Sequence, residues 1–402
     1  MPGLSEYIAN QDNSPAAGKQ YINTYTVGFG NIGNSQLLQD TADYGGGKFF
    51  TTGNTSGLVT ALKSIVVDIL AENTTFTTPT VSVSAYSNFG YRNDLFYALF
   101  RPADGARWVG NIKKYKAITD STTGDLIVTD ALGNNAVDTT TGFFNDSAQS
   151  YWSPSADGKN AERGGAASKL TVPSTRKIYT YTGTDRLAGS GMTTSVNLTT
   201  GNSNILSDSN TAVTKAMLGD SVMTDAYKTN LLSWARGTNP TTSTARLQIA
   251  DVLHNAPKVV AYVSDEDLAR VAAGTNQDSM VLFYGTNEGH IGAINPATGD
   301  ELFVFIPKEI LPNLKAYYDD PKGSTNKKYG IDGQFGLKVS YGAVDATTKL
   351  RPVSQVLLYA GMGRGGRNYY ALDVSPDSSG APSTIQPKLK WAIKGGTTGT
   401  AY

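Results

Sequence analysis

The sequence predicts a multi-domain fold that joins an α/β lobe to a mainly β remainder. Three observations lead to this prediction. The chain has 402 residues, more than a single ordinary domain contains. Strand and helix patterns alternate over residues 1–75, whereas little helical periodicity follows them. The 43 glycines and 22 tyrosines, with many Thr, Ser and Asn, are typical of strands joined by turns.

The N-terminal lobe alternates strands and helices. Residues 21–30 (YINTYTVGFG) are typical of a strand buried on both faces of a parallel sheet. A helix over 35–44, ended by three glycines, and a short strand over 48–52 follow. The strongest helix covers 56–73. Its apolar stripe consists of Leu58, Ala61, Leu62, Ile65, Val66 and Ile69. Residues 1–75 therefore form half of a doubly wound domain.

Residues 76–245 are predicted to be a β-rich linking region that could contribute strands to the C-terminal part of the chain. Alternation over 79–87 favours a strand, and two hairpins are expected over 94–117 and 123–138. The polar residues 182–210 indicate a surface loop. Short helices are expected over 211–220 and 224–237, and a domain boundary near Ala245.

Residues 246–402 contain an internal repeat. Residues 281–295 (VLFYGTNEGHIGAIN) and 356–373 (VLLYAGMGRGGRNYYALD) each run from an apolar strand through a turn into a second strand. A third strand follows each one, ELFVFIP and KLKWAIK, and a weaker copy covers 95–112. Such units are typical of β-propeller blades, and about four are needed to close a ring. The sequence predicts an incomplete propeller with an insertion at 308–348.

Composition excludes several classes of function. The net charge is zero, which argues against binding to nucleic acid or an anionic membrane surface. Cysteine is absent, so disulfides and thiolate chemistry are excluded. No stretch approaches the roughly 20 apolar residues of a membrane span. The start, MPGLSEYIAN, lacks the features of a signal peptide, so we expect the export signal to lie elsewhere in a longer protein.

No catalytic or cofactor-binding residue is predicted. His254 and His290 have no partner at metal-ligand spacing, so structural hydrogen bonding is the favoured role for both. Residues 361–367 (GMGRGGR) could suit a phosphate, but they join two strands, which favours a hairpin turn. The turn glycines expected to need a positive φ are Gly105, Gly289, Gly299 and Gly365.

Metal binding stays open on the sequence alone. Residues 155–165 offer Asp157, Asn160 and Glu162, fewer than the five or so oxygen ligands that a calcium loop supplies. Residues 40–47 and 318–326 fall short in the same way. Metal ligands are therefore unknown, and calcium remains possible without an assigned loop.

Longer strings resemble a known family. YTVGFG, LLQDTADYGGGKFFTT and LVTALKSIVVDIL resemble the C-terminal half of a von Willebrand factor A domain. LFYALFRPADGARWVGNIKKYKA, RKIYTYTG, WARG, DVLHNAP, YGTNEGHIGAINPATGDELFVFIPKEILPNL, KKYGIDG and GMGRGGRNYYALDV resemble the PilC/PilY family of type IV pilus tip proteins. The strings keep the family's order along nearly all of the chain.

The resemblance implies a large, non-enzymatic secreted protein of Gram-negative bacteria. It implies a von Willebrand-like domain followed by a propeller, placed at the pilus tip on minor pilins. The implied roles are promotion of pilus assembly, adhesion to a host or abiotic receptor, surface sensing and twitching. The family's Asp-x-Ser-x-Ser metal site would precede Met1, and its aspartate-rich calcium loop and an Arg-Gly-Asp motif have no match here.

Two other interpretations compete with this one. The repeat also resembles blades of quinoprotein alcohol dehydrogenases, which hold pyrroloquinoline quinone, but the expected cysteine pair and channel carboxylates are missing. A purely structural carrier domain is the third interpretation. Edge strands left unpaired by an incomplete propeller could also pair with a minor pilin, which we treat as a hypothesis.

Overall fold

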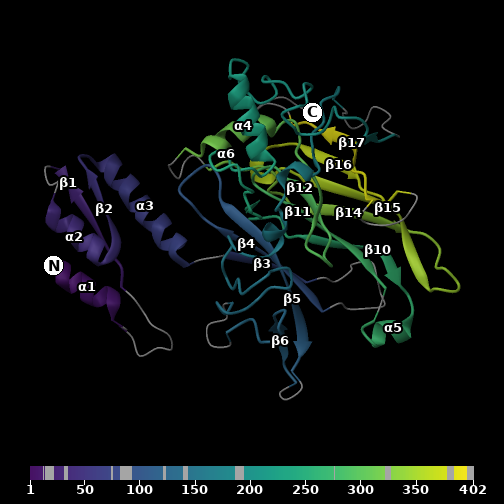
Figure 1. The fold of residues 1–402 in the computed structure, drawn as a ribbon, viewed down its shortest axis with the longest axis horizontal. Coiled ribbons are helices and arrows are strands. Elements are labelled where there is room, and N and C mark those ends of the chain that lie inside the picture. The colour runs from purple at the N-terminus through teal and green to yellow at the C-terminus, as the bar shows by residue number, and fades with distance from the viewer. Residues whose placement is uncertain are drawn as a thin grey trace. The chain divides into compact units, whose positions relative to one another are not determined.

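The computed structural model describes residues 1–11, 13, 22–30, 35–73, 76–81, 93–120, 124–138, 144–185, 194–275, 277–321, 327–377 and 384–395. Its helices are α1 (Pro2–Asn10), α2 (Gln36–Tyr44), α3 (Thr55–Asn73), α4 (Asp225–Ala235), α5 (Leu268–Ala272) and α6 (Leu314–Asp319). The chain forms two compact units, one mainly Met1–Thr74 and the other mainly the residues from Thr75 onward. The fold is mixed α/β and mostly β (Figure 1).

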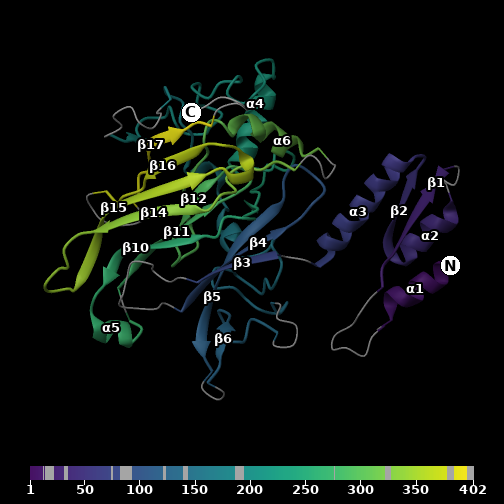
Figure 2. The ribbon, with the colours of Figure 1, turned by 180° about the vertical axis from the view of Figure 1, so that it is seen from behind.

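The N-terminal unit has the predicted order of strands and helices from its first strand to α3, and helix α1, which was not predicted, precedes them. Strands β1 (Thr24–Phe29) and β2 (Gly46–Thr52) pair in parallel, with α1 and α2 on one side and α3 on the other (Figure 2). The Ser35 side chain caps α2 by accepting a hydrogen bond from the Leu38 N–H. The burial of β1 differs from the prediction of a strand buried on both faces. β1 is mostly half-buried because only one strand pairs with it among the described residues.

The apolar stripe of α3 is narrower than predicted. Leu58 and Ile65 are half-buried and Ala61 is buried, but Leu62 is 50% exposed. The side chains of Val66 and Ile69 lie outside the described residues. The buried positions are spaced by three and four residues, which places Leu62 at the edge of the stripe.

The C-terminal unit contains a 5-stranded sheet. Its strands are β3 (Phe76–Val81), β4 (Asp94–Arg101), β5 (Val109–Thr119) and β6 (Leu126–Thr129), with β9 (Ile249–Ala250) beside β5. The predicted hairpin over 94–117 is confirmed as β4 and β5. Residues 82–87 of the predicted strand lie outside the described residues.

A second, 10-stranded sheet holds both copies of the repeat. The first meander is β10 (Lys258–Asp265), β11 (Ser279–Gly285), β12 (Ile291–Ile294) and β13 (Glu301–Phe305). The second meander is β14 (Phe335–Tyr341), β15 (Leu350–Gly361), β16 (Tyr369–Asp373) and β17 (Lys388–Ile393). Pairing of β10 with β15 joins them into one curled half-barrel, and β7 (Ile178–Tyr179) and β8 (Val196–Asn197) lie at its edges.

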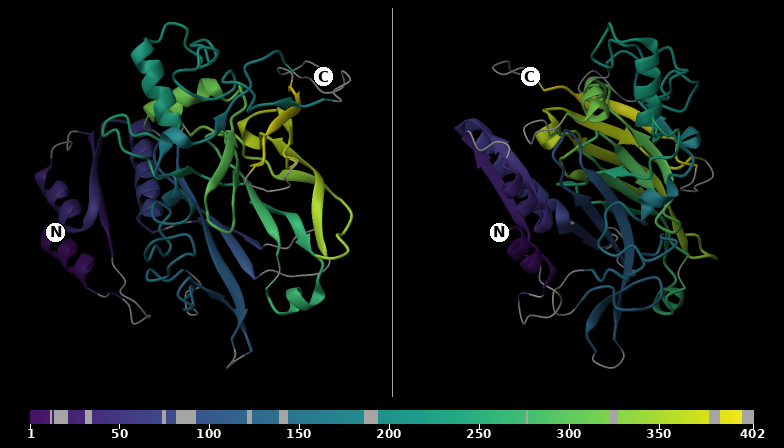
Figure 3. Two further views of the ribbon diagram at one scale, coloured as in Figure 1. Left: turned by 45° about the vertical axis from the view of Figure 1, so that its right-hand side comes forward. Right: turned by 60° about the vertical axis from the view of Figure 1, so that its left-hand side comes forward.

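Strand β14 corrects the predicted insertion. It lies inside the expected insertion 308–348, yet it is the first strand of the second meander and pairs with β15 along its whole length. Only the part before β14, with α6, is added between the meanders. α6 packs beside α4 (Figure 3). Between them, the Tyr227 hydroxyl donates to Asp319 at 2.6 Å.

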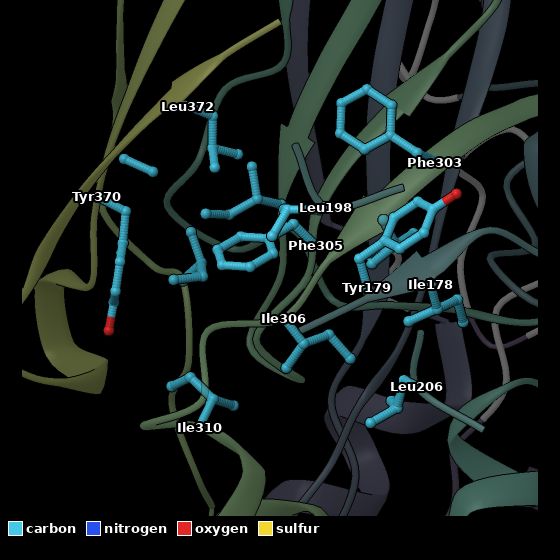
Figure 4. Packing of buried hydrophobic residues seen from close by; sticks show 14 of the residues in the cluster. Ile178, Tyr179, Leu198, Leu206, Phe303, Phe305, Ile306, Ile310, Tyr370 and Leu372 are labelled. Carbon is cyan, nitrogen blue, oxygen red and sulfur yellow. The ribbon is translucent and has the colours of Figure 1, made fainter. Parts of the chain in front are cut away.

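The inner faces of the two meanders share the main core. Strand alternation directs Val281 and Phe283 of β11, and Val356 and Leu358 of β15, into the same apolar cluster. Figure 4 shows part of this cluster, with Phe303 and Phe305 from the first meander and Tyr370 and Leu372 from the second. The corresponding residues of the repeat therefore face the same interior.

The outer face of the first meander carries a second layer. Leu282, Tyr284 and Ile294 form a cluster with Phe96 and Ile112 of the 5-stranded sheet. Trp152 completes this cluster and stacks on Phe96 with 5.7 Å between ring centroids. Both faces of the first meander are therefore buried.

The segment 194–206 corrects the surface-loop prediction. Leu198 and Leu206 are fully buried in the main core, and Figure 4 shows both among its side chains. Within the segment, β8 pairs with β17, and Ile205 forms a bridge with Tyr179. The segment thus spans from one edge of the curled sheet to the other. Of the two helices predicted after it, only 224–237 is helical, as α4, while 211–220 forms turns.

Candidate functional site: a glycine-rich turn cluster

Four segments far apart in the sequence meet at one end of the curled sheet. They are residues 251–257, 285–290, 327–333 and 361–367, which we name the turn cluster. Backbone hydrogen bonds join them: Ile331 N–H donates to Thr286 at 2.9 Å, and Asp332 N–H donates to Met362 at 3.2 Å. The Asn287 N–H completes the set by donating to Asp251 at 3.1 Å.

Glycines allow these turns to approach each other main chain to main chain. A Cβ on Gly330 would lie 2.5 Å from the Gly289 nitrogen, and a Cβ on Gly365 would lie 1.9 Å from the Gly330 oxygen. Among the four predicted turn glycines, Gly289 and Gly299 have φ of +89° and +82°. Gly105 and Gly365 do not have positive φ, and space rather than φ excludes a side chain at Gly365.

Asp251 and Lys327 form a buried ion pair inside the cluster. The Lys327 ammonium donates to Asp251 Oδ1 at 2.8 Å, and Asn287 Nδ2 donates to Oδ2 at 2.6 Å. Burial raises the Asp251 pKa despite the opposing charge of Lys327. Lys327 also lies 4.3 Å from the Trp108 ring centroid, a cation–π contact. Sequence reasoning missed this pair because its members are 76 positions apart.

A second buried acid, Glu288, lies opposite Arg246. The two side chains are 3.5 Å apart, and the Arg246 guanidinium stacks 4.1 Å from the Trp234 ring centroid. Burial acts to raise the Glu288 pKa, but the positive charge of Arg246 and its neighbours prevails and holds the pKa below its usual range. Trp234, which belongs to the WARG string, therefore supports this turn through its contact with Arg246.

The two histidines have different surroundings. His254 is 41% exposed, and its Nδ1 lies 2.8 Å from Asp332 Oδ2, a hydrogen bond that agrees with the predicted structural role. Asp332 is buried, and its Oδ1 has no hydrogen-bond partner among the described residues. His290 is buried beside Glu288, and burial lowers its pKa to about 4, so its imidazole is neutral at pH 7.

The stretch considered for calcium binds a lysine instead. Lys113 Nζ lies 3.0 Å from Asp157 Oδ2, and both side chains are almost fully buried. The same carboxylate accepts hydrogen bonds from Ser150 and Ser153 at 2.8 and 2.7 Å. Glu162 pairs with Arg101. The oxygens of Asp157 are therefore occupied, and this stretch does not fit a calcium ion.

The described residues of the other two stretches do not form a ligand set either. Asp40 accepts from Gln36 on α2, and Asp319 pairs with Lys315. The end of the second stretch, 322–326, lies outside the described residues. Across the described ranges, no three His, Cys, Asp or Glu side chains gather as metal ligands would.

Residues 361–367 form the predicted turn between strands. A short 3-10 helix, Gly363–Gly365, joins β15 to β16. Arg364 is exposed and lies 5.7 Å from the Tyr329 ring centroid. The acids of the cluster, Asp251, Glu288 and Asp332, are all buried. Each of these acids lies beside a basic side chain, Lys327, Arg246 or His254.

None of the helices in the described part of the chain combines the length and hydropathy of a transmembrane segment. The chain is 25% identical over 376 residues to the type IV pilus biogenesis factor PilY1 of Pseudomonas aeruginosa, covering 86% of this chain and 27% of that protein. It is 34% identical over 99 residues to a PilY1 homolog of Xylella fastidiosa, covering 25% of this chain and 7% of that protein. No family model and no solved structure matches.

These comparisons support similarity to PilY1-type pilus factors. The chain spans about a quarter of the length of the Pseudomonas protein. The turn cluster and most of the strings that carry the resemblance lie in the C-terminal unit.

Proposed function

We propose that this chain is part of a non-enzymatic type IV pilus biogenesis factor that acts at the pilus tip. The single observation that carries the proposal is the similarity to PilY1 of Pseudomonas aeruginosa over 376 residues, in which the two chains run colinearly. The resemblance extends the proposal to adhesion, surface sensing and twitching, outside a Gram-negative cell. Minor pilins and a host or abiotic receptor are the proposed partners.

The proposed architecture has three parts, with boundaries at 75 and 245. The strand–helix–strand–helix order of the N-terminal unit supports a partial von Willebrand A-like lobe. Two four-stranded antiparallel meanders, each containing one copy of the repeat, support the beginning of a propeller. Pairing of β10 with β15, however, places both meanders in one sheet, which separate propeller blades would not share.

A structure of a longer form tests this architecture. A propeller requires the meanders to separate into neighbouring blades around a channel, which breaks the pairing of Val263 with Pro352. A disulfide between cysteines introduced at these two positions would be compatible with the curled sheet alone. If the double cysteine variant of the longer form oxidises and keeps its fold, the propeller proposal fails.

The function is tested in the bacterium that carries the gene. Deletion of the gene should reduce the number of surface pili and abolish twitching, and the full-length gene supplied in trans should restore both. A pilus gene deletion with no complementation serves as the negative reference. Normal piliation and twitching after deletion would contradict the proposal.

No observation favours the quinoprotein alternative. The buried acids of the turn cluster are paired internally with Lys327, Arg246 and His254. Neither relative is described as a dehydrogenase. The purified protein should therefore show no quinone absorbance after incubation with pyrroloquinoline quinone and calcium followed by dialysis.

A further inference from the structure

The two meanders differ in what covers their outer faces. On the first, Leu282 and Tyr284 of β11 pack against the 5-stranded sheet. The matching positions of the repeat on the second are Leu357 and Tyr359 of β15, because Val281 and Val356 both face the shared core. The outer face of the second meander thus corresponds to the face of the first meander that the 5-stranded sheet covers.

This counterpart is apolar and aromatic. Strand register places Tyr359, Ala371 and Trp391 side by side across β15, β16 and β17. The rings of Tyr359 and Trp391 have centroids 5.8 Å apart. Tyr369 and Ile393 form the next row and are 57% and 37% exposed. We name these five residues with Leu357 the open face.

No core cluster of the described residues includes the open face. Leu357 and Ala371 are buried, but neither belongs to the three apolar clusters of the described chain. Tyrosine and tryptophan are the side chains that protein interfaces favour at their centres. The exposed Tyr369 and Ile393, beside the partly exposed rings of Tyr359 and Trp391, therefore indicate a binding surface.

The rim of the open face carries unpaired positive charge. Lys338 of β14 and Lys388 of β17 flank Leu357 and Asp373 in one row across the strands. No carboxylate within the described ranges lies within ion-pair distance of either lysine. Asp373 accepts hydrogen bonds from Ser375 at 3.1 and 2.6 Å.

We propose that the open face binds a partner protein that presents an apolar, aromatic centre and an acidic rim. The centre of the partner corresponds in chemistry to Phe96, Ile112 and Trp152, which seal the matching face of the first meander. The acidic rim complements Lys338 and Lys388. The choice of a protein as the partner rests on the proposed function, because a pilus factor needs protein partners.

The open face is not suited to binding a second copy of this chain. A two-fold interface places the same patch of both copies together, which would bring four lysines but only two carboxylates, those of Asp373, into one rim. Like charges across an interface weaken association. Nucleic acid is also disfavoured, since two lysines would neutralise too few phosphates for useful affinity.

Site-directed photo-cross-linking tests the proposal in the bacterium that carries the gene. A photoreactive phenylalanine analogue replaces Tyr369 in the full-length protein, and the matched control replaces Tyr44, which is 56% exposed in the N-terminal unit. We expect a specific adduct at position 369 and none at position 44. Mass spectrometry of the adduct should identify a peptide that contains apolar or aromatic residues beside Asp or Glu.

Charge reversal then tests the rim. Lys338→Glu with Lys388→Glu should lower the adduct yield about tenfold or more, because each reversal turns attraction into repulsion. Reversal of Lys63 and Lys169, which are exposed on other elements, is the matched control and should leave the yield unchanged. Circular dichroism must show that all variants are folded.

Several outcomes would overturn the proposal. They are an adduct to the chain's own residues, an adduct between two copies, equal labelling at positions 369 and 44, and insensitivity to charge reversal at the rim. Each is independent of the test of function, since gene deletion can abolish piliation whether or not this face binds a protein. Loss of piliation without a specific adduct would refute the binding face alone.

Discussion

The first and second meanders have similar sequences but different environments. In the first, both faces are buried, and the turn between β11 and β12 buries Glu288 and His290. In the second, the outer face has exposed residues, Tyr369 and Ile393, and the turn between β15 and β16 exposes Arg364. The repeat therefore specifies the strands and the inner face, while the outer face and the turn are set by what each copy contacts.

The largest expected effect compares the matching tyrosines. Tyr284→Ala should lower the free energy of unfolding by about 3–5 kcal/mol, because it opens a cavity between two sheets. Tyr359→Ala should cost about 1–2 kcal/mol, since that ring lies on the open face. Urea unfolding followed by fluorescence measures both. Equal losses would mean that the two outer faces are equally covered.

The pH dependence of stability tests a difference between the two turns, because only the turn of the first meander contains a buried histidine, His290. His290 has a pKa of about 4 in the folded state because it is buried, against about 6.5 when unfolded. The unfolded chain therefore binds more protons between these values, so the free energy of unfolding falls as pH drops through this window, by up to about 3 kcal/mol. Urea unfolding at several pH values measures the slope.

His290→Gln is the control for that slope. The charges nearest to His290 are Glu288, Arg176, Glu301 and Arg246, and the substitution leaves all of them in place. The variant should lose the dependence between about pH 5 and 6.5, while carboxylates continue to act below it. A slope that persists unchanged in the variant would assign the effect to another group.

A smaller effect comes from the residues paired with the two tyrosines. Tyr284 pairs with Gly292, and Tyr359 pairs with Ala371. A Cβ on Gly292 would lie 2.3 Å from the Tyr284 ring, so Gly292→Ala should cost about 1–3 kcal/mol through overpacking. Ala371→Gly should cost about 1 kcal/mol or less. Thermal unfolding of both variants measures these losses. A neutral Gly292→Ala would contradict the close packing of Tyr284 on Gly292.

The smallest expected effect is at the exposed turn. Arg364→Ala should change the free energy of unfolding by about 0.5 kcal/mol or less, because its contact with Tyr329 is at the surface. Chemical denaturation of wild type and variant side by side measures the difference. A loss above about 2 kcal/mol would show that Arg364 supports the turn cluster from within.

Local patterns predicted much of the fold. Period-two alternation and turn glycines located β4, β5, β11, β12, β15 and β16, and helical periodicity with glycine stops located α2 and α3. The repeat was also visible, although its closing strings AIN and ALD are not equivalent in register. Phe283 pairs with Ala293, whereas Leu358 pairs with Leu372, since the second turn is longer.

Long-range features were not predictable. The polar segment 194–206 gave no apolar pattern, yet Leu198 and Leu206 are fully buried, because single leucines fill holes made by distant strands. The pairs Lys113–Asp157 and Lys327–Asp251 join residues 44 and 76 positions apart, and no spacing rule connects them. The turn cluster likewise depends on contacts between segments that are neighbours only after folding.

The segment 194–206 cannot complete its pairing until much of the later chain has been synthesised. Asn197 pairs with Lys388, and these partners are separated by 388 − 197 = 191 residues. At common rates of translation the first partner waits roughly 10–40 s before the second leaves the ribosome. Until then Leu198 and Leu206 lack part of their core, so the nascent chain should need a chaperone that shields this region.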